Sequence, residues 1–151
     1  MESGQRALRR GRHSQAGQVY LLTAVTLQRQ PWFRDDAAAR AAARSFGSQA
    51  SLGDARLLAW VLMPDHAHWL LELGERDALA QVVRRIKSFS ARSANAALQR
   101  LGPVWSEAYH DHALRREEDL RAVARYIVMN PLRAGLVQRL GDYPYWNAIW
   151  L

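Results

Sequence analysis

The hydrophobic and polar positions along the chain predict strands and helices in alternation. Runs of β-branched and apolar residues predict strands, and apolar residues spaced three or four apart predict helices. The predicted elements are a strand over 19–26, a helix over 37–46 after Asp35-Asp36, strands over 57–63 and 66–73 around a Pro64-Asp65 turn, a helix over 78–101, a short strand within 104–114 and a helix over 119–130 that Pro131 ends. This order predicts an α+β sandwich, in which helices cover one face of an antiparallel sheet.

The chain is the length of one domain. Its 151 residues allow one sizeable core. We expect residues 1–17 to form a basic flexible arm and residues 18–151 to form a single domain, with the glycine-flanked segment 47–53 as a loop. No apolar stretch is long enough to cross a bilayer, so no membrane partner is expected.

The charge balance favours a nucleic-acid partner. There are 21 basic and 14 acidic residues, a formal net charge of +7, and Lys87 is the only lysine. Arginine binds phosphate through two parallel hydrogen bonds and stacks on bases, although genomic base composition also raises arginine content. Cysteine is absent, which excludes disulfides and thiolate zinc sites and fits a reducing cytoplasm. We expect a cytoplasmic protein that is associated with the nucleoid.

A histidine pair is the first feature with catalytic chemistry. His66 and His68 flank Ala67, and alternate residues of a strand share a face, so both imidazoles are expected to point the same way. Two imidazoles on one face can bind one divalent cation. The structural alternative is a pair of half-exposed histidines beside a turn.

The helix over 119–130 carries the second feature. Its apolar stripe is bordered by Tyr126 and Asn130, which are four residues apart and therefore lie on one edge. Tyr126 offers a nucleophilic oxygen, and the Asn130 amide offers a hard oxygen ligand suited to Mg²⁺ or Mn²⁺. Alternatively, Tyr126 packs at the rim of the core and Asn130 simply ends the helix.

Three segments together resemble one protein family. The segment 63–71, with sequence MPDHAHWLL, resembles the His-hydrophobic-His (HUH) motif of single-tyrosine transposases, although its central residue Ala67 is smaller than usual. The segment 126–137, YIVMNPLRAGLV, resembles their tyrosine helix. Trp105 and the segment 111–115, DHALR, resemble the branch of REP-associated tyrosine transposases.

This resemblance implies a ferredoxin-like, RRM-like fold and a DNA-cleaving activity. Tyr126 would attack single-stranded DNA beside a hairpin, forming a 5′-phosphotyrosine, and His66, His68 and Asn130 would hold Mg²⁺ or Mn²⁺. The expected product is transposed or transferred DNA. The protein is expected to act as a monomer or a homodimer.

Basic side chains are the expected contacts to the DNA backbone. Trp105 and Tyr109 could stack on an unpaired base, with core packing as the alternative for Trp105, and the aromatic residues of the tail are expected to pack on the core. The basic residues could equally form a solvated face. They are Arg84, Arg85, Lys87, Arg92, Arg115 and Arg116, together with Arg9, Arg10 and Arg12 of the arm.

Two other function classes fit parts of the sequence. A non-catalytic nucleic-acid-binding module of RRM-like fold would explain the charge, and it predicts neither metal dependence nor a covalent product. A metal-dependent phosphoesterase that uses water would leave Tyr126 structural, and it predicts repeated turnover without a protein–DNA adduct.

Overall fold

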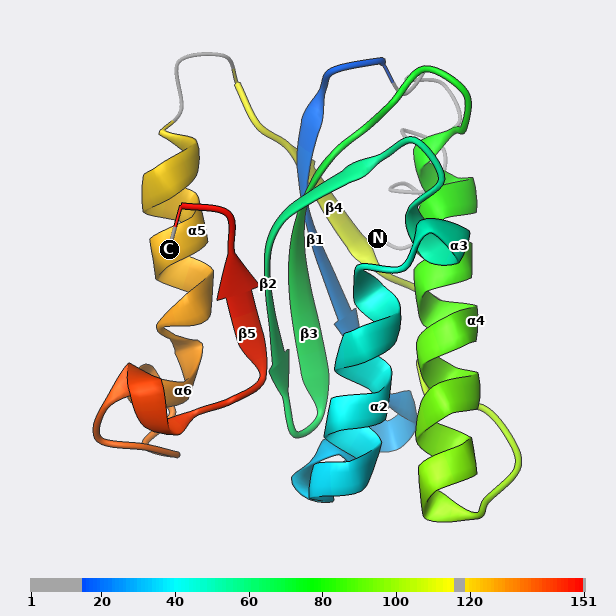
Figure 1. The fold of residues 1–151 in the computed structure, drawn as a ribbon, viewed down its shortest axis with the longest axis vertical. Helices are drawn as coiled ribbons and strands as arrows, with labels where there is room; N and C mark the ends of the chain where they lie inside the picture. Colours follow the sequence, from blue (N-terminus) through cyan, green and yellow to red (C-terminus); the bar gives the residue numbers. More distant parts are fainter. Residues whose placement is uncertain (1–14, 116–118, 151) are drawn as a thin grey trace.

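A five-stranded antiparallel sheet forms the centre of the molecule (Figure 1). A computed structural model describes residues 15–115 and 119–150 of the chain. The elements in chain order are β1 (Val19–Val25), α2 (Asp36–Phe46), α3 (Gln49–Leu52), β2 (Arg56–Met63), β3 (His66–Glu72), α4 (Leu79–Leu98), β4 (His110–Ala113), α5 (Leu120–Val128), α6 (Asn130–Arg133) and β5 (Trp146–Ala148), with short 3₁₀ turns at Leu27–Arg29, Trp32–Arg34 and Leu140–Asp142.

The strand order confirms the predicted ferredoxin-like arrangement. The strands lie in the order β4-β1-β3-β2-β5, and every neighbouring pair is antiparallel. Helix α2 connects β1 to β2, and α4 connects β3 to β4, so the β-α-β-β-α-β order read from the sequence is present. Strand β5, in the aromatic tail, adds a further edge beside β2.

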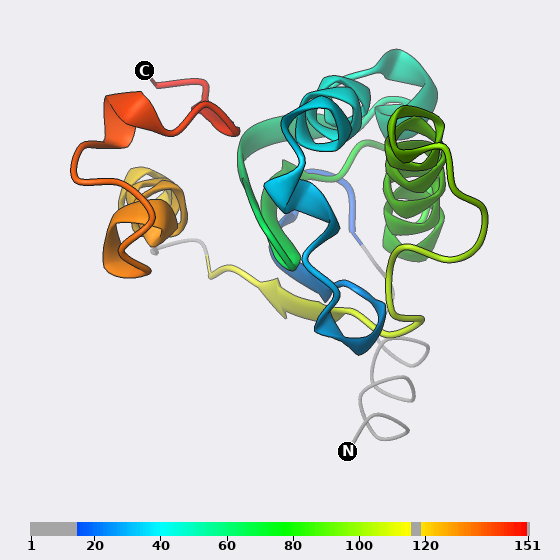
Figure 2. The same cartoon turned by 90° about the horizontal axis from the view of Figure 1, so that it is seen from below.

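Alternation along β3 divides the sheet into two faces. Ala67, Trp69 and Leu71 are buried in a core with residues of α2 and α4. The residues between them point to the other face, where Leu70 is buried with residues of α5. Figure 2 shows α5 and α6 on one side of the sheet and α2 and α4 on the other. The α+β class is therefore confirmed, but the helices cover both faces rather than one.

Several element boundaries differ from the sequence prediction for local reasons. Helix α2 begins where expected, because the Asp35 carboxylate accepts a hydrogen bond from the Ala38 amide at 2.9 Å. Helix α4 ends at Leu98 rather than 101, because Gln99 adopts a left-handed conformation with φ 53°. The predicted loop 47–53 contains the short helix α3.

Within the described part of the chain, no helix combines the length and apolar character that crossing a membrane requires.

Candidate active site

The two motif histidines lie side by side on β3. Their ring centroids are 5.1 Å apart and the rings meet edge to face at 81°. The Nδ1 atom of His66 lies 2.8 Å from a carboxylate oxygen of Asp65, and Nδ1 of His68 lies 2.8 Å from the hydroxyl of Thr23 on β1. With Nδ1 engaged on both rings, Nε2 is the atom left to bind a ligand. Such partners fix the orientation of an imidazole, as around metal-binding histidines.

The environment keeps His68 neutral. Burial, then the neighbouring His66 and the positive charge of Arg133, lower the pKa of His68 from its ordinary 6.5 to about 4. At neutral pH the ring therefore keeps a lone pair that can bind a cation.

Helix α5 supplies the tyrosine. It begins where the Asp119 carboxylate accepts hydrogen bonds from the amides of Arg121 and Ala122. The predicted apolar stripe is confirmed, since Ala124, Ile127 and Val128 are buried and Leu120 and Val123 pack partly buried against them. Tyr126 lies outside this stripe, with 65% of its surface exposed. The helix is held by its apolar face while the phenol remains accessible.

The helix breaks between the tyrosine and the asparagine. Helix α5 ends at Val128, and Asn130 is the first residue of α6. The prediction that the helix runs to residue 130 and is ended by Pro131 is wrong. Proline is tolerated in a first helical turn because its missing N–H has no partner there, and Pro131 occupies the first turn of α6.

Arg133 joins the tyrosine and the asparagine, and the sequence analysis did not identify it. Its Nη2 donates to the backbone oxygen of Tyr126 at 2.6 Å and to Oδ1 of Asn130 at 2.9 Å. Its guanidinium carbon lies 3.9 Å from the centre of the Tyr126 ring. The spacing was the available signal, because Arg133 is three residues after Asn130 and seven after Tyr126.

The donor set suits a hard divalent cation. Two imidazole nitrogens and one amide oxygen are compatible with Mg²⁺ or Mn²⁺ and waters. The Asn130 oxygen already accepts one hydrogen bond from Arg133, and an amide oxygen has a second lone pair. No cluster of three or more His, Cys, Asp or Glu side chains able to hold a metal occurs among the described residues, so a site here depends on Asn130.

The predicted DNA-contact residues on α4 fall into two groups. Arg84 and Arg92 are exposed, and Arg92 stacks on Phe89 at 4.5 Å. Lys87 is partly buried and donates to the backbone oxygens of Ser106, at 2.6 Å, and Glu107, at 3.0 Å. Burial lowers the pKa of Lys87. The exposed arginines can reach a phosphate directly. Lys87 instead hydrogen-bonds the backbone of the segment that follows α4 and so links that segment to the helix.

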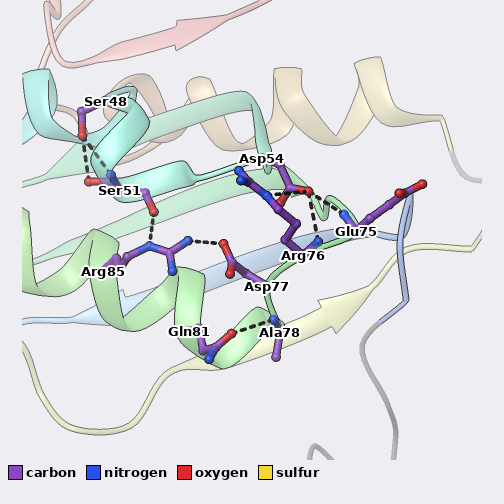
Figure 3. A network of polar contacts seen from close by, with 9 residues as sticks. All are labelled: Ser48, Ser51, Asp54, Glu75, Arg76, Asp77, Ala78, Gln81 and Arg85. Atoms are coloured by element: carbon purple, nitrogen blue, oxygen red, sulfur yellow. Dashed lines mark hydrogen bonds and ion pairs between the residues drawn. The ribbon is translucent and has the colours of Figure 1, made fainter.

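Arg85 is also engaged within the protein (Figure 3). Its guanidinium forms an ion pair with Asp77 at 2.8 Å and donates to the backbone oxygen of Ser51 at 3.0 Å. It therefore ties α4 to α3 and to the segment before α4. Arg115 is exposed two residues after the end of β4. Arg116 and the arm residues Arg9, Arg10 and Arg12 lie outside the described residues.

The aromatic residues also divide by role. Trp105 is buried, and its Nε1 donates to Ser90 Oγ at 3.0 Å, so core packing is confirmed for it. Tyr109 lines a groove of about 630 Å³ that reaches Thr23, the partner of His68. In the tail, Tyr143 is buried and donates to the Leu62 backbone oxygen at 2.5 Å, which confirms the expected packing of the tail on the core.

The fold and the site together have the arrangement expected of a single-tyrosine transposase: an antiparallel sheet, a histidine pair on one strand, and a tyrosine helix on the same face. A family model described as "Transposase IS200 like" matches residues 14–130. The chain belongs to this family of transposases.

Comparison with individual proteins shows similarity to a narrower group, the REP-associated tyrosine transposases. A REP-associated tyrosine transposase of Escherichia coli (strain K12) is 32% identical over 89 residues, 58% of this chain and 50% of that protein. A Haemophilus influenzae relative is 29% identical over 94 residues, 56% of this chain and 53% of that protein. The chain thus spans about half the length of the curated relatives it matches.

A solved structure extends the similarity over the fold. The structure of a REP-associated tyrosine transposase bound to a REP hairpin is 25% identical, with a TM-score of 0.68, and covers 89% of this chain and 79% of that one. The resemblance read from the three sequence segments is confirmed.

Proposed function

We propose that this protein cleaves and transfers single-stranded DNA beside a hairpin, through a covalent 5′-phosphotyrosine at Tyr126. The observation that carries the proposal is the link between the two motifs. Arg133 hydrogen-bonds Asn130, stacks on Tyr126 and places its charge close enough to lower the pKa of His68. This link supports our proposal that the histidine pair, Tyr126 and Asn130 act as one site.

The relatives support a hairpin-bearing DNA as the substrate. The solved relative is described as bound to a REP hairpin, and we extend a hairpin-bearing substrate to this chain. The groove of about 630 Å³ supports a single strand next to that hairpin, because its lining includes Thr23, the partner of His68, together with Tyr109 and His110. A groove of that size suits a nucleotide base and its sugar.

The reaction consumes no external oxidant or energy source. The Tyr126 phenol oxygen attacks phosphorus in line, so a new O–P bond forms and the P–O3′ bond breaks. The electron pair of the broken bond leaves with O3′, and the proton lost by the phenol ends on O3′ as a hydroxyl. The phosphotyrosine conserves the phosphodiester bond energy, so another 3′-hydroxyl can later reseal the strand.

We also propose a divalent site at His66, His68 and Asn130. Mg²⁺ or Mn²⁺ bound there would polarise the scissile phosphate and offset charge that develops in the transition state. The contacts from Asp65 and Thr23 hold the two imidazoles in place before any cation arrives. Arg133 does the same for the amide oxygen.

Substitution of the tyrosine tests the proposal. Tyr126→Phe removes one oxygen from an exposed ring and is expected to leave fold and hairpin affinity near wild type while abolishing both cleavage and adduct. The assay is a denaturing gel of protein mixed with Mg²⁺ or Mn²⁺ and a labelled hairpin oligonucleotide with a single-stranded flank. Tyr145→Phe is the matched control, since its phenol donates to Asp36 instead.

The same gel separates the other function classes. Cleavage without an adduct in both wild type and Tyr126→Phe would indicate a hydrolase that uses water. Binding of hairpins by wild type without cleavage of any of them would indicate a nucleic-acid-binding module. An adduct that survives in Tyr126→Phe would place the nucleophile on another tyrosine, with Tyr109 the next to substitute.

A further inference from the structure

Arg133 makes more contacts with the site than a structural role requires. Donation to the Tyr126 carbonyl satisfies one of the last four carbonyls of α5, which have no partner inside the helix. A helix cap needs only that contact. Arg133 also donates to the Asn130 side chain and covers the Tyr126 ring. One guanidinium thus touches both polar side chains that α5 and α6 bring to the site.

The Arg133 guanidinium has donors left for a ligand. Both hydrogen bonds use Nη2, so among the described residues Nε and Nη1 donate to no protein atom. The side chain is exposed. A guanidinium carries five N–H groups, and the three on Nε and Nη1 can each donate to a phosphate oxygen.

We propose that Arg133 is a further catalytic residue, which binds a non-bridging oxygen of the scissile phosphate beside Tyr126. The inference rests on the proposed cleavage reaction and adds a contact to it. When the phenol oxygen bonds to phosphorus and the P–O3′ bond breaks, negative charge grows on the non-bridging oxygens. The positive guanidinium of Arg133 offsets that charge and then holds the phosphate of the phosphotyrosine.

A neutral substrate tests this contact directly. A methylphosphonate at the scissile position replaces one non-bridging oxygen by a methyl group and removes the negative charge, and the position is taken from the wild-type cleavage product. On the natural phosphate, Arg133→Ala is expected to slow adduct formation about 100-fold or more. On the methylphosphonate, Arg133→Ala and wild type are expected to react at similar rates.

The chain offers a matched control at Arg100. Its guanidinium carbon lies 4.1 Å from the Trp32 ring, and Nη1 donates to Asn95 Oδ1 at 2.7 Å, so it makes the same kinds of contact with an aromatic ring and an asparagine. Arg100→Ala is expected to react like wild type on both substrates. Arg133→Lys keeps the charge without the planar fork and is expected to recover only part of the rate on phosphate.

A binding measurement gives a readout that does not depend on cleavage. In the Tyr126→Phe protein with EDTA, the phosphate oligonucleotide is expected to bind several-fold more tightly than the methylphosphonate. In the Tyr126→Phe, Arg133→Ala double variant the two are expected to bind equally.

Two results would overturn the inference while leaving the proposed function intact. One is wild-type adduct formation by Arg133→Ala on phosphate. The other is an equal loss on both substrates, which would limit Arg133 to positioning Tyr126 and Asn130. If wild type forms no adduct on any hairpin substrate, the proposed cleavage reaction is refuted. The proposed role of Arg133 in that reaction is then refuted as well.

Discussion

Replacing His68 by asparagine should remove a defined part of the pH dependence of stability. Burial is the main cause that lowers the pKa of His68 to about 4, against 6.5 for an ordinary histidine. The folded protein therefore binds fewer protons than the unfolded chain between these values. The stability that the neutral ring contributes is complete above pH 6.5 and is lost as the pH falls toward 4.

The size of the effect follows from the two pKa values. At pH 4.5 almost every unfolded chain carries the proton, whereas most folded molecules do not, and the difference corresponds to a loss of about 2–3 kcal/mol relative to pH 7.5. Asparagine does not titrate, and its amide occupies the place of Nδ1, so it can keep the hydrogen bond to Thr23. His68→Asn therefore removes the titrating group while retaining the hydrogen bond to Thr23.

Urea unfolding in EDTA at pH 7.5 and 4.5 measures this loss. Between the two pH values the midpoint of wild type is expected to fall by about 1–2 M more than that of His68→Asn. His110→Asn, which makes the same substitution at an exposed histidine on β4, is the matched control. Equal losses in wild type and His68→Asn would refute the reasoning, as would direct titration of the His68 ring near pH 6.5.

Three further predictions test the packing and the charged surface. Tyr143→Phe leaves the buried Leu62 carbonyl without its hydrogen bond, and should lower the free energy of unfolding by about 1–3 kcal/mol, measured by thermal melting. Arg85→Ala breaks the ion pair with Asp77, and should reduce stability in urea while weakening hairpin binding less than Arg84→Ala does. Hairpin affinity should fall steeply with salt, with a slope of about −0.7 per phosphate contacted on a single strand, and a flat response would refute phosphate contacts.

Local patterns in the sequence were sufficient for much of the fold. The alternation of apolar and polar residues over 66–73 predicts which residues of β3 face the core under α2 and α4. The shared face of His66 and His68 follows from the same alternation. The apolar stripe of α5 predicts its buried side, and it places Tyr126 at the edge of that side. These features depend on neighbours within one element, so a single sequence contains them.

Features that depend on distant partners could not be predicted in this way. Arg85 and Lys87 have the spacing of a solvated helix face, but Asp77, Ser51 and Ser106 approach them from other segments. The sequence likewise predicted helices on one face only, whereas α5 packs on the face opposite α2 and α4. Tertiary contacts of this kind are set by topology, which periodicity does not encode.

The division of the molecule into two faces makes the chemistry testable without loss of the fold. The face covered by α2 and α4 contains the larger buried cluster, including Trp69 of β3. The histidines extend from that strand to the opposite face, where Tyr126 and Arg133 are exposed at the surface. Substitutions at exposed positions usually change stability by about 0.5 kcal/mol or less. A loss of cleavage in Tyr126→Phe, with unchanged unfolding, would therefore report on the reaction and not on the stability of the protein.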